Sequence, residues 1–150
     1  VVRLPADRIA TVLPLAGASL SIDGHSVQVG PPRTHELVPA ARLYSRLVVI
    51  KGFLEPEPFL DAARRQLATL DVRGTPSLVE QAHVEGANAG KPTGSHSPYL
   101  RRTIRIAGKE VVGFAVRVED LTAEESMLLQ EKGLGGRRRF GCGLFIPDRR

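Results

Sequence analysis

The sequence predicts an α+β fold, and the order of its periodic segments is the first reason. From Leu43 onward the segments read strand, helix, strand, strand, helix, strand. The strand segments carry alternating or continuous apolar residues, whereas the helix segments carry apolar residues three and four positions apart. This order is that of the split βαβ fold, also called ferredoxin-like or RRM-like, in which a four-stranded antiparallel sheet bears both helices on one face.

The first strand and helix of this domain, which we expect at residues 42–147, have the clearest patterns. Leu43–Phe53 contains the unbroken apolar run Leu47–Ile50, which indicates a central strand buried on both faces. In the helix expected over 55–70, prolines occur only in the first turn, where no intrahelical hydrogen bond is lost. Its apolar residues form one stripe, made of Phe59, Leu60, Ala63, Leu67 and Leu70.

A strand over 75–85 follows, although a helix also fits these residues, and then a loop over 86–98 that is rich in glycine, proline and serine. Residues 99–106 and 111–121 read as the arms of a hairpin. In the first arm Leu100, Arg102, Ile104 and Ile106 share one face, and Arg101, Thr103 and Arg105 share the other. In the second arm we expect Val112, Phe114, Val116 and Val118 to face the core.

The last helix is marked at both ends. Thr122 and Glu125 have the spacing of a capping box at its start, and Gly133 is suited to a left-handed cap at its end. The residues 141–147 then supply a final strand.

Residues 1–38 are expected to form a separate part. A helix over 4–13, ended by Pro14 and Gly17, precedes a hairpin around Asp23-Gly24, a strong turn dipeptide. One helix and one short hairpin bury too little apolar surface to be stable alone. We therefore interpret this part as the C-terminal half of a first ferredoxin-like domain, and we expect further residues upstream of Val1.

The composition favours a polyanionic partner. Among 150 residues, 21 Lys and Arg outweigh 16 Asp and Glu, which gives a formal net charge of +5. The single cysteine, Cys142, excludes an intrachain disulfide, and no spacing of Cys and His suggests a metal site. No apolar run is long enough to span a membrane. We expect a cytoplasmic protein that needs no metal or cofactor.

The segment EKGLGGRRRFGCGLFIP, residues 131–147, combines flexible backbone with positive charge. Gly133, Gly135 and Gly136 allow positive φ angles and could expose backbone amides to a phosphate, and Arg137, Arg138 and Arg139 supply planar cations. The alternative is a glycine helix cap followed by solvated charges. Arg101, Arg102 and Arg105 would form a second phosphate-contacting stripe, or a merely solvated strand face.

The same segment also contains the spacing QxxGxG, starting at Gln130, which is similar to the pyrophosphate loop of acyl-CoA-dependent N-acetyltransferases. That loop should follow a strand and open a helix, whereas here a helix precedes it and a strand follows. The acetyltransferase therefore remains a third possibility.

GLGGRRRFGCGLFIP resembles the C-terminal glycine-rich loop and last strand of the CRISPR repeat-processing endoribonucleases, which belong to the repeat-associated RAMP superfamily. LYSRLVVIKGFLEPEPFLDAARRQL resembles the second ferredoxin-like domain of that family, particularly of its myxobacterial-type subgroup. The similarity covers most of Pro5–Pro147.

The resemblance implies two ferredoxin-like domains that grip the stem-loop of a precursor CRISPR RNA and cut it at the base of the stem without metal. The 2′-hydroxyl of the RNA attacks, which leaves a 2′,3′-cyclic phosphate, and the enzyme often stays within an interference complex with other subunits. RNA contacts of the family's glycine loop carry over to Gly133, Gly135, Gly136, Arg137, Arg138 and Arg139. Aromatic residues make up only 5% of the chain, which favours a folded stem held by its phosphates over a stacked single strand.

The catalytic residues are unknown from this sequence. The family's histidine usually lies in the first helix of the N-terminal domain, so we expect it upstream of Val1. Of the histidines present, His25 and His35 read as solvated and His83 as a strand residue, and His96 is the best placed to approach RNA. A non-cleaving RNA-binding subunit of the same superfamily is the second possibility, because it would keep the fold without a general base.

Overall fold

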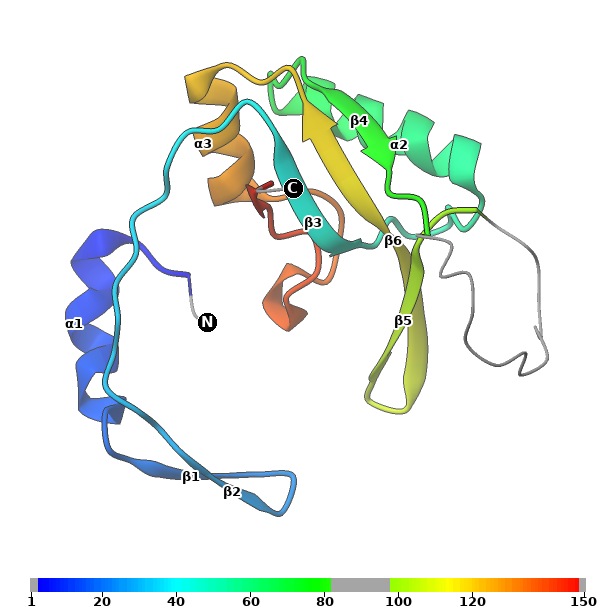
Figure 1. Ribbon diagram of the computed structural model, residues 1–150. Coiled ribbons are helices and arrows are strands. Elements are labelled where there is room, and N and C mark those ends of the chain that lie inside the picture. Colours follow the sequence, from blue (N-terminus) through cyan, green and yellow to red (C-terminus); the bar gives the residue numbers. More distant parts are fainter. Residues whose placement is uncertain (1–2, 82–97, 149–150) are drawn as a thin grey trace, which may run out of the picture. The chain divides into compact units, whose positions relative to one another are not determined.

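The computed structural model describes residues 3–81 and 98–148 (Figure 1). The chain divides into two compact units, residues 1–36 and residues 37–150. Of the helices in the described part, none is both long enough and apolar enough to cross a membrane.

The first unit is a short helical segment followed by a hairpin. The helical segment consists of a single α-helical turn, α1 (Ile9–Val12), between the 3-10 turns η1 (Ala6–Arg8) and η2 (Leu13–Leu15). The expectation of a continuous helix ended by Pro14 is wrong, because Pro14 fits the first turn of η2 and the chain stays coiled through Leu15.

The hairpin of this unit is confirmed, with β1 (Ser19–Ile22) antiparallel to β2 (His25–Gln28). Asp23 and Gly24 have φ angles of 50° and 78°, the two positive values that a type I′ turn requires. No described residue of the unit is buried, and its exposed apolar side chains include Leu13, Leu15, Leu20, Ile22 and Val27.

The second unit contains a five-stranded antiparallel sheet. Its strands are β3 (Leu43–Val48), β4 (Thr75–Leu78), β5 (Arg101–Ile106), β6 (Lys109–Glu119) and β7 (Ile146–Pro147). Four of them follow the order β4-β6-β3-β7, which is the ferredoxin-like order and confirms the predicted fold.

The sheet has one strand more than the four-stranded plan predicts, because the strand expected over 75–85 and the first arm of the hairpin both pair with β6. β5 pairs with the first half of β6, and β4 pairs with the second half, so both lie along the same edge of β6. The amide of Leu100 donates to the carbonyl of Val79 at 2.7 Å, which joins the end of β4 to the start of β5. β4 ends at Leu78, and residues 82–85 of the predicted strand lie outside the described residues.

β3 occupies the centre of the sheet and is buried on both faces, as its apolar run predicts. Val48 and Ile50 join the main core, whereas Leu47 and Val49 pack with Cys142 on the opposite face. The pairing with β6 shifts between Ser45 and Val48, because three steps along β3 match two along β6. This β-bulge lies at Arg46 and Leu47.

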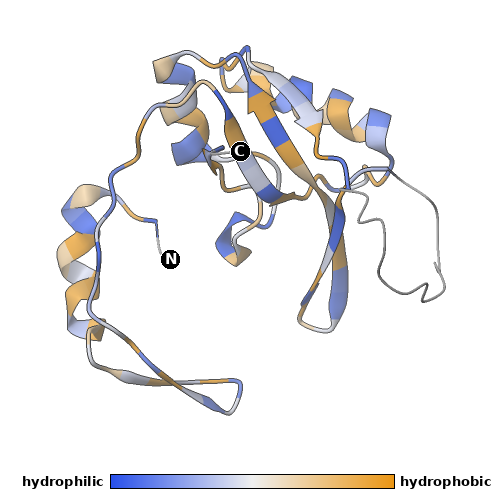
Figure 2. Ribbon diagram, viewed as in Figure 1, coloured by the Kyte–Doolittle hydropathy of each residue, from blue (hydrophilic) through white to orange (hydrophobic). Residues whose placement is uncertain are grey.

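Two helices cover the face of the main core: α2 (Pro56–Thr69) and α3 (Ala123–Lys132) (Figure 1). From α2, Phe59 meets Phe114 of β6 edge to face, with ring centroids 4.9 Å apart. Figure 2, in which the ribbon is coloured by hydropathy, shows hydrophobic residues along much of β6. Phe114, Val116 and Val118 are buried as expected.

The predicted cap of α3 is confirmed. The amide of Glu125 donates to the Thr122 hydroxyl, and the Glu125 carboxylate accepts from the amide of Thr122 at 2.9 Å. Gly133 follows with φ 65° and ψ −175°, a positive-φ conformation that differs from the left-handed helix and is accessible essentially only to glycine.

Two buried polar side chains of α3 hold the segment that leads into β3. The Gln130 side-chain amide donates to the carbonyl of Val38 at 2.9 Å and to the Ser126 hydroxyl at 3.2 Å. The same hydroxyl accepts from the amide of Ala40 at 2.9 Å. Residues 38–40 are therefore tied to α3 by two partly buried hydrogen bonds.

Candidate functional site

The glycine-rich segment between α3 and β7 lies along the end of β3. The amide of Gly136 donates to the carbonyl of Val49 at 2.7 Å, and the amide of Gly143 donates to that of Leu47 at 2.6 Å. Within the segment, the amide of Leu134 donates to the carbonyl of Gly143 at 3.0 Å. The segment is thus a folded loop that is anchored to the central strand.

The glycines allow this close approach of backbone to backbone. A Cβ atom at Gly135, where φ is 76°, would overlap the carbonyl oxygen of Val49. One at Gly143 would overlap the carbonyl oxygen of Leu134, and one at Gly133 would lie 2.5 Å from the carbonyl oxygen of Gly143. A side chain at any of the three would push the loop away from its support.

This arrangement differs from the expected role of the glycines. The amide of Gly133 donates to Leu129, that of Gly135 to the side-chain oxygen of Gln66 at 2.9 Å, and that of Gly136 to Val49. All three amides therefore have partners within the protein, because the loop must satisfy its own backbone where it packs on β3 and α2.

The arginines of the segment lie at its surface. Arg137 has a left-handed conformation, with φ 60° and ψ 26°, and begins the 3-10 turn η3 (Arg138–Phe140). The Arg138 guanidinium donates to the carbonyl of Lys132 and so caps the end of α3. Phe140 follows the arginines with 57% of its surface exposed.

A cleft of about 390 Å³ separates this segment from β3 and β5. Its lining comes from all three elements: Arg46, Leu47, Arg101, Arg102, Thr103, Ile104, Phe140, Gly141 and Cys142. The cleft therefore brings two of the predicted arginines to the glycine-rich segment. Arg137, Arg138 and Arg139 do not line it, but they directly precede Phe140, which does.

The arginines that line the cleft have no carboxylate partner in the described part of the chain. Arg46 and Arg101 take part in none of the ion pairs found among residues 3–81 and 98–148. Nε of Arg102 is buried and has no hydrogen-bond partner. A buried donor without an acceptor lowers the stability of the folded protein, and a ligand that supplies an acceptor would remove this penalty.

Arg105, by contrast, lies apart from the cleft. The predicted alternation of faces along β5 is confirmed, since Arg102, Ile104 and Ile106 are half-buried and the residues between them are exposed. Arg105 pairs with Glu110 across the hairpin, with 3.6 Å between nitrogen and oxygen. The structure therefore separates Arg105 from Arg102.

Two residues of the cleft were missed in the sequence. Arg46 is the one charged residue of strand β3 and directly precedes its apolar run, and that position was the available signal. Phe140 lies between three arginines and a glycine, outside any segment with a periodic pattern, so nothing in the sequence indicated its role.

Cys142 lies at the floor of the cleft and is almost fully buried. Burial raises the pKa of its thiol, although the positive charge of Arg137 opposes this. At neutral pH the group is therefore a neutral thiol, which is a weak nucleophile and a poor base.

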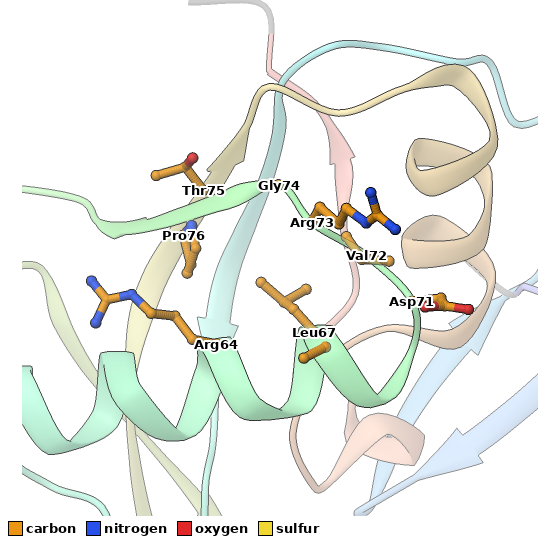
Figure 3. A pocket seen from close by; sticks show the side chains of 9 residues that line it. Arg64, Leu67, Asp71, Val72, Arg73, Gly74, Thr75 and Pro76 are labelled. Atoms are coloured by element: carbon orange, nitrogen blue, oxygen red, sulfur yellow. The ribbon is translucent and has the colours of Figure 1, made fainter.

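A second hollow of about 410 Å³ lies between the end of α2 and the start of β4 (Figure 3). Arg64 and Arg73 lie at its opposite ends, with Leu67 and Val72 between them. Arg64 is paired with Asp61 at 2.7 Å. A charge that is already paired is less suited to capture an anion than the arginines of the first cleft.

Of the four histidines, His25 lies in β2 and His35 lies near the end of the first unit, and both are exposed. His83 and His96 lie outside the described residues. The structure holds no group of three or more His, Cys, Asp or Glu side chains that could bind a metal ion within its described part.

The geometry does not favour the acetyltransferase interpretation. Gln130 is buried, and its side-chain amide donates to Val38 rather than facing a ligand. The loop follows α3 and leads only to the three-residue turn η3, so the helix N-terminus that would bind a pyrophosphate is replaced by a helix C-terminus.

Comparison with known proteins identifies the family of this chain. The family model described as Cas6 Crispr matches residues 1–150. The chain is 40% identical over 148 residues to the CRISPR-associated endonuclease Cas6 of Myxococcus xanthus (strain DK1622). The match covers 99% of this chain and 56% of the relative, so the chain spans little more than half of that protein's length. Because the family model covers the whole chain, this protein belongs to the Cas6 family of CRISPR proteins.

Proposed function

We propose that this chain is the C-terminal portion of an endoribonuclease that binds and processes precursor CRISPR RNA at the repeat stem-loop. The observation that carries the proposal is the cleft in which Arg46, Arg101 and Arg102 meet Phe140 of the glycine-rich segment. The name of the Myxococcus xanthus relative, an endonuclease, supports the same activity.

The cleft suits RNA because its cations lack competing carboxylates. A guanidinium fork can bind two oxygens of one phosphate, and the release of counterions from the RNA adds to the binding free energy. Arg137, Arg138 and Arg139 extend the positive surface along the same loop, and Arg105 contacts phosphates beyond the cleft. Gly133, Gly135 and Gly136 act by holding the loop in place rather than by binding phosphate themselves.

The reaction requires a base for the 2′-hydroxyl and an acid for the leaving group. The 2′-oxygen attacks the adjacent phosphorus as its proton passes to the base, the bond from phosphorus to the 5′-oxygen breaks, and the acid protonates that oxygen. The products are a 2′,3′-cyclic phosphate and a 5′-hydroxyl. No metal takes part in this scheme.

Among the described residues, the lining of the cleft contains no histidine or carboxylate, and its one thiol is neutral. Following the family resemblance, our proposal assigns the general base to a histidine of the first domain, upstream of Val1. This unit serves as the RNA clamp, residues 1–38 complete the first ferredoxin-like domain, and the enzyme stays on its product together with other subunits of a CRISPR interference complex in the cytoplasm.

The test is cleavage of an end-labelled repeat stem-loop in EDTA, by this chain and by a longer chain of the relative's length. We expect both chains to bind and only the longer one to cut. Cleavage by the short chain would turn attention to its own four histidines. Failure of both to bind would refute the proposal.

A charge-matched pair of variants tests the cleft itself. One replaces Arg46, Arg101 and Arg102 by glutamine, and the control replaces Arg42, Arg64 and Arg65, of which the first two are ion-paired. A plot of log affinity against log salt concentration has a negative slope. The loss of three phosphate contacts should make that slope shallower by about 2–3 in the first variant only. Equal slopes in the two variants would contradict this use of the cleft.

The second candidate is a non-cleaving RNA-binding subunit of the same superfamily. The cleft lining favours it in one respect, since it offers cations and an aromatic ring but no general base. If the longer chain binds the stem-loop and leaves it uncut, this candidate is correct.

A further inference from the structure

The cleft beside the glycine-rich segment has an apolar floor as well as charged walls. Leu47 and Cys142 are buried at the floor, and Ile104 is half-buried beside them. A groove that bound only phosphates would gain nothing from these side chains. They indicate a ligand that has an apolar surface in addition to its charge.

Phe140 provides an aromatic wall on a fixed backbone. Its amide donates to the carbonyl of Arg137 at 2.9 Å, and the amide of Gly141 donates to Arg138 at 3.0 Å, which closes the turn on both sides of the ring. Phe140 is more than half exposed, although the buried apolar residues Leu47 and Cys142 line the same cleft. The turn therefore holds the ring at the mouth of the cleft instead of burying it.

Arg102 supplies the charged wall. Its Nε is buried without an acceptor, whereas Arg105 on the same strand already has Glu110 as a partner. Arg46 stands on β3, across the cleft from β5. An anion placed between these two arginines would complete the hydrogen bonding of Arg102.

We propose that the cleft binds a single unpaired nucleotide of the repeat RNA. The base lies against Phe140 and above Leu47 and Ile104, and its phosphate lies between Arg102 and Arg46. This inference rests on the proposed RNA-binding function and adds to it a subsite for one nucleotide next to the stem. The cleft volume, about 390 Å³, suits one nucleotide and not a duplex.

The test combines an RNA series with one protein variant. Each unpaired nucleotide of the repeat stem-loop is replaced in turn by an abasic nucleotide, and the Kd of each RNA is measured for the chain and for Phe140→Ala. Loss of one stacked base should weaken binding by roughly 5- to 150-fold at one position. Because the ring is exposed, Phe140→Ala should fold normally, which circular dichroism checks.

The decisive result is the coupling between the two changes. In Phe140→Ala the abasic penalty at that position should disappear, since the base has already lost its partner, while Phe140→Trp should restore it. Arg102→Gln should weaken binding of the parent RNA more than binding of an RNA with an uncharged methylphosphonate at this position, and Arg102→Lys, which lacks Nε, should restore binding only in part. Arg64→Gln, on α2 and outside the proposed RNA surface, is the matched control and should show no coupling.

The outcomes separate this inference from the proposed function. If no stem-loop binds, the proposed function itself fails. If the stem-loop binds with the expected salt dependence, but the abasic penalty is the same in the chain and in Phe140→Ala at every position, only the nucleotide subsite is refuted.

Discussion

Replacement of Gly135 by alanine separates the role of this glycine in packing from the phosphate-binding role that the sequence suggests. In the structure its φ is 76°, and an added Cβ atom would overlap the carbonyl oxygen of Val49 and lie 3.1 Å from a methyl group of Val48. Gly136, the next residue, has no positive φ and would place a Cβ atom 3.8 Å from the same oxygen. The two neighbours therefore form a matched pair.

The expected magnitude follows from these two features. A left-handed conformation costs a non-glycine residue about 1–2 kcal/mol, and relieving an overlap within a packed site costs about 1–3 kcal/mol. Gly135→Ala should thus lower the free energy of unfolding by about 2–5 kcal/mol. Gly136→Ala should change it by less than about 1 kcal/mol, toward greater stability, because alanine restricts the unfolded chain.

Urea unfolding followed by circular dichroism measures both values. The denaturation midpoint of Gly135→Ala should fall well below that of the parent, and that of Gly136→Ala should stay close to it. Equal midpoints for the two variants would refute the argument that backbone contact with β3 requires glycine at position 135. A loss of RNA binding in Gly136→Ala without a loss of stability would instead revive the phosphate-binding role of that residue.

Three further predictions concern groups away from the cleft mouth. Hydrogen bonds from the Thr122 and Arg73 amides lower the pKa of Glu125, so its stabilising effect is present above the ordinary carboxyl pKa and is lost as pH falls through the lowered value. The gap in urea midpoint between the parent and Glu125→Gln should accordingly close in acid, and a constant gap would contradict the capping role. Cys142 should react with a thiol reagent at least about tenfold more slowly in the native chain than in urea at pH 8, because it is buried and its pKa is raised; equal rates would show that it is accessible. Gln130→Leu should cost about 1–3 kcal/mol of unfolding free energy by leaving the Val38 carbonyl without this donor, whereas an unchanged midpoint would mean that water replaces the amide.

Much of the fold could be read from local physics. The apolar run of β3 predicts a central strand. Successive side chains of a strand point to opposite faces of the sheet, so consecutive apolar residues indicate that both faces are buried. Thr122 and Glu125 predict the start of α3, since a capping box closes within four residues. Period-two alternation predicts the two faces of β5. Each of these patterns depends on residues that are close together in the chain, so it can be recognised without knowledge of the tertiary structure.

The basic charge, the glycine-rich segment and the order of elements follow from the amino-acid sequence alone. Which residues share a cleft depends on the tertiary structure, because the bulge at Arg46 and the pairing of β5 with β6 bring together residues about 35–95 positions apart. The tertiary structure also supplies acceptors, which lie on α3, on α2 and at the end of β3, for the amides of Gly133, Gly135 and Gly136. Contacts of this kind depend on the packing of distant segments, and no local pattern encodes them.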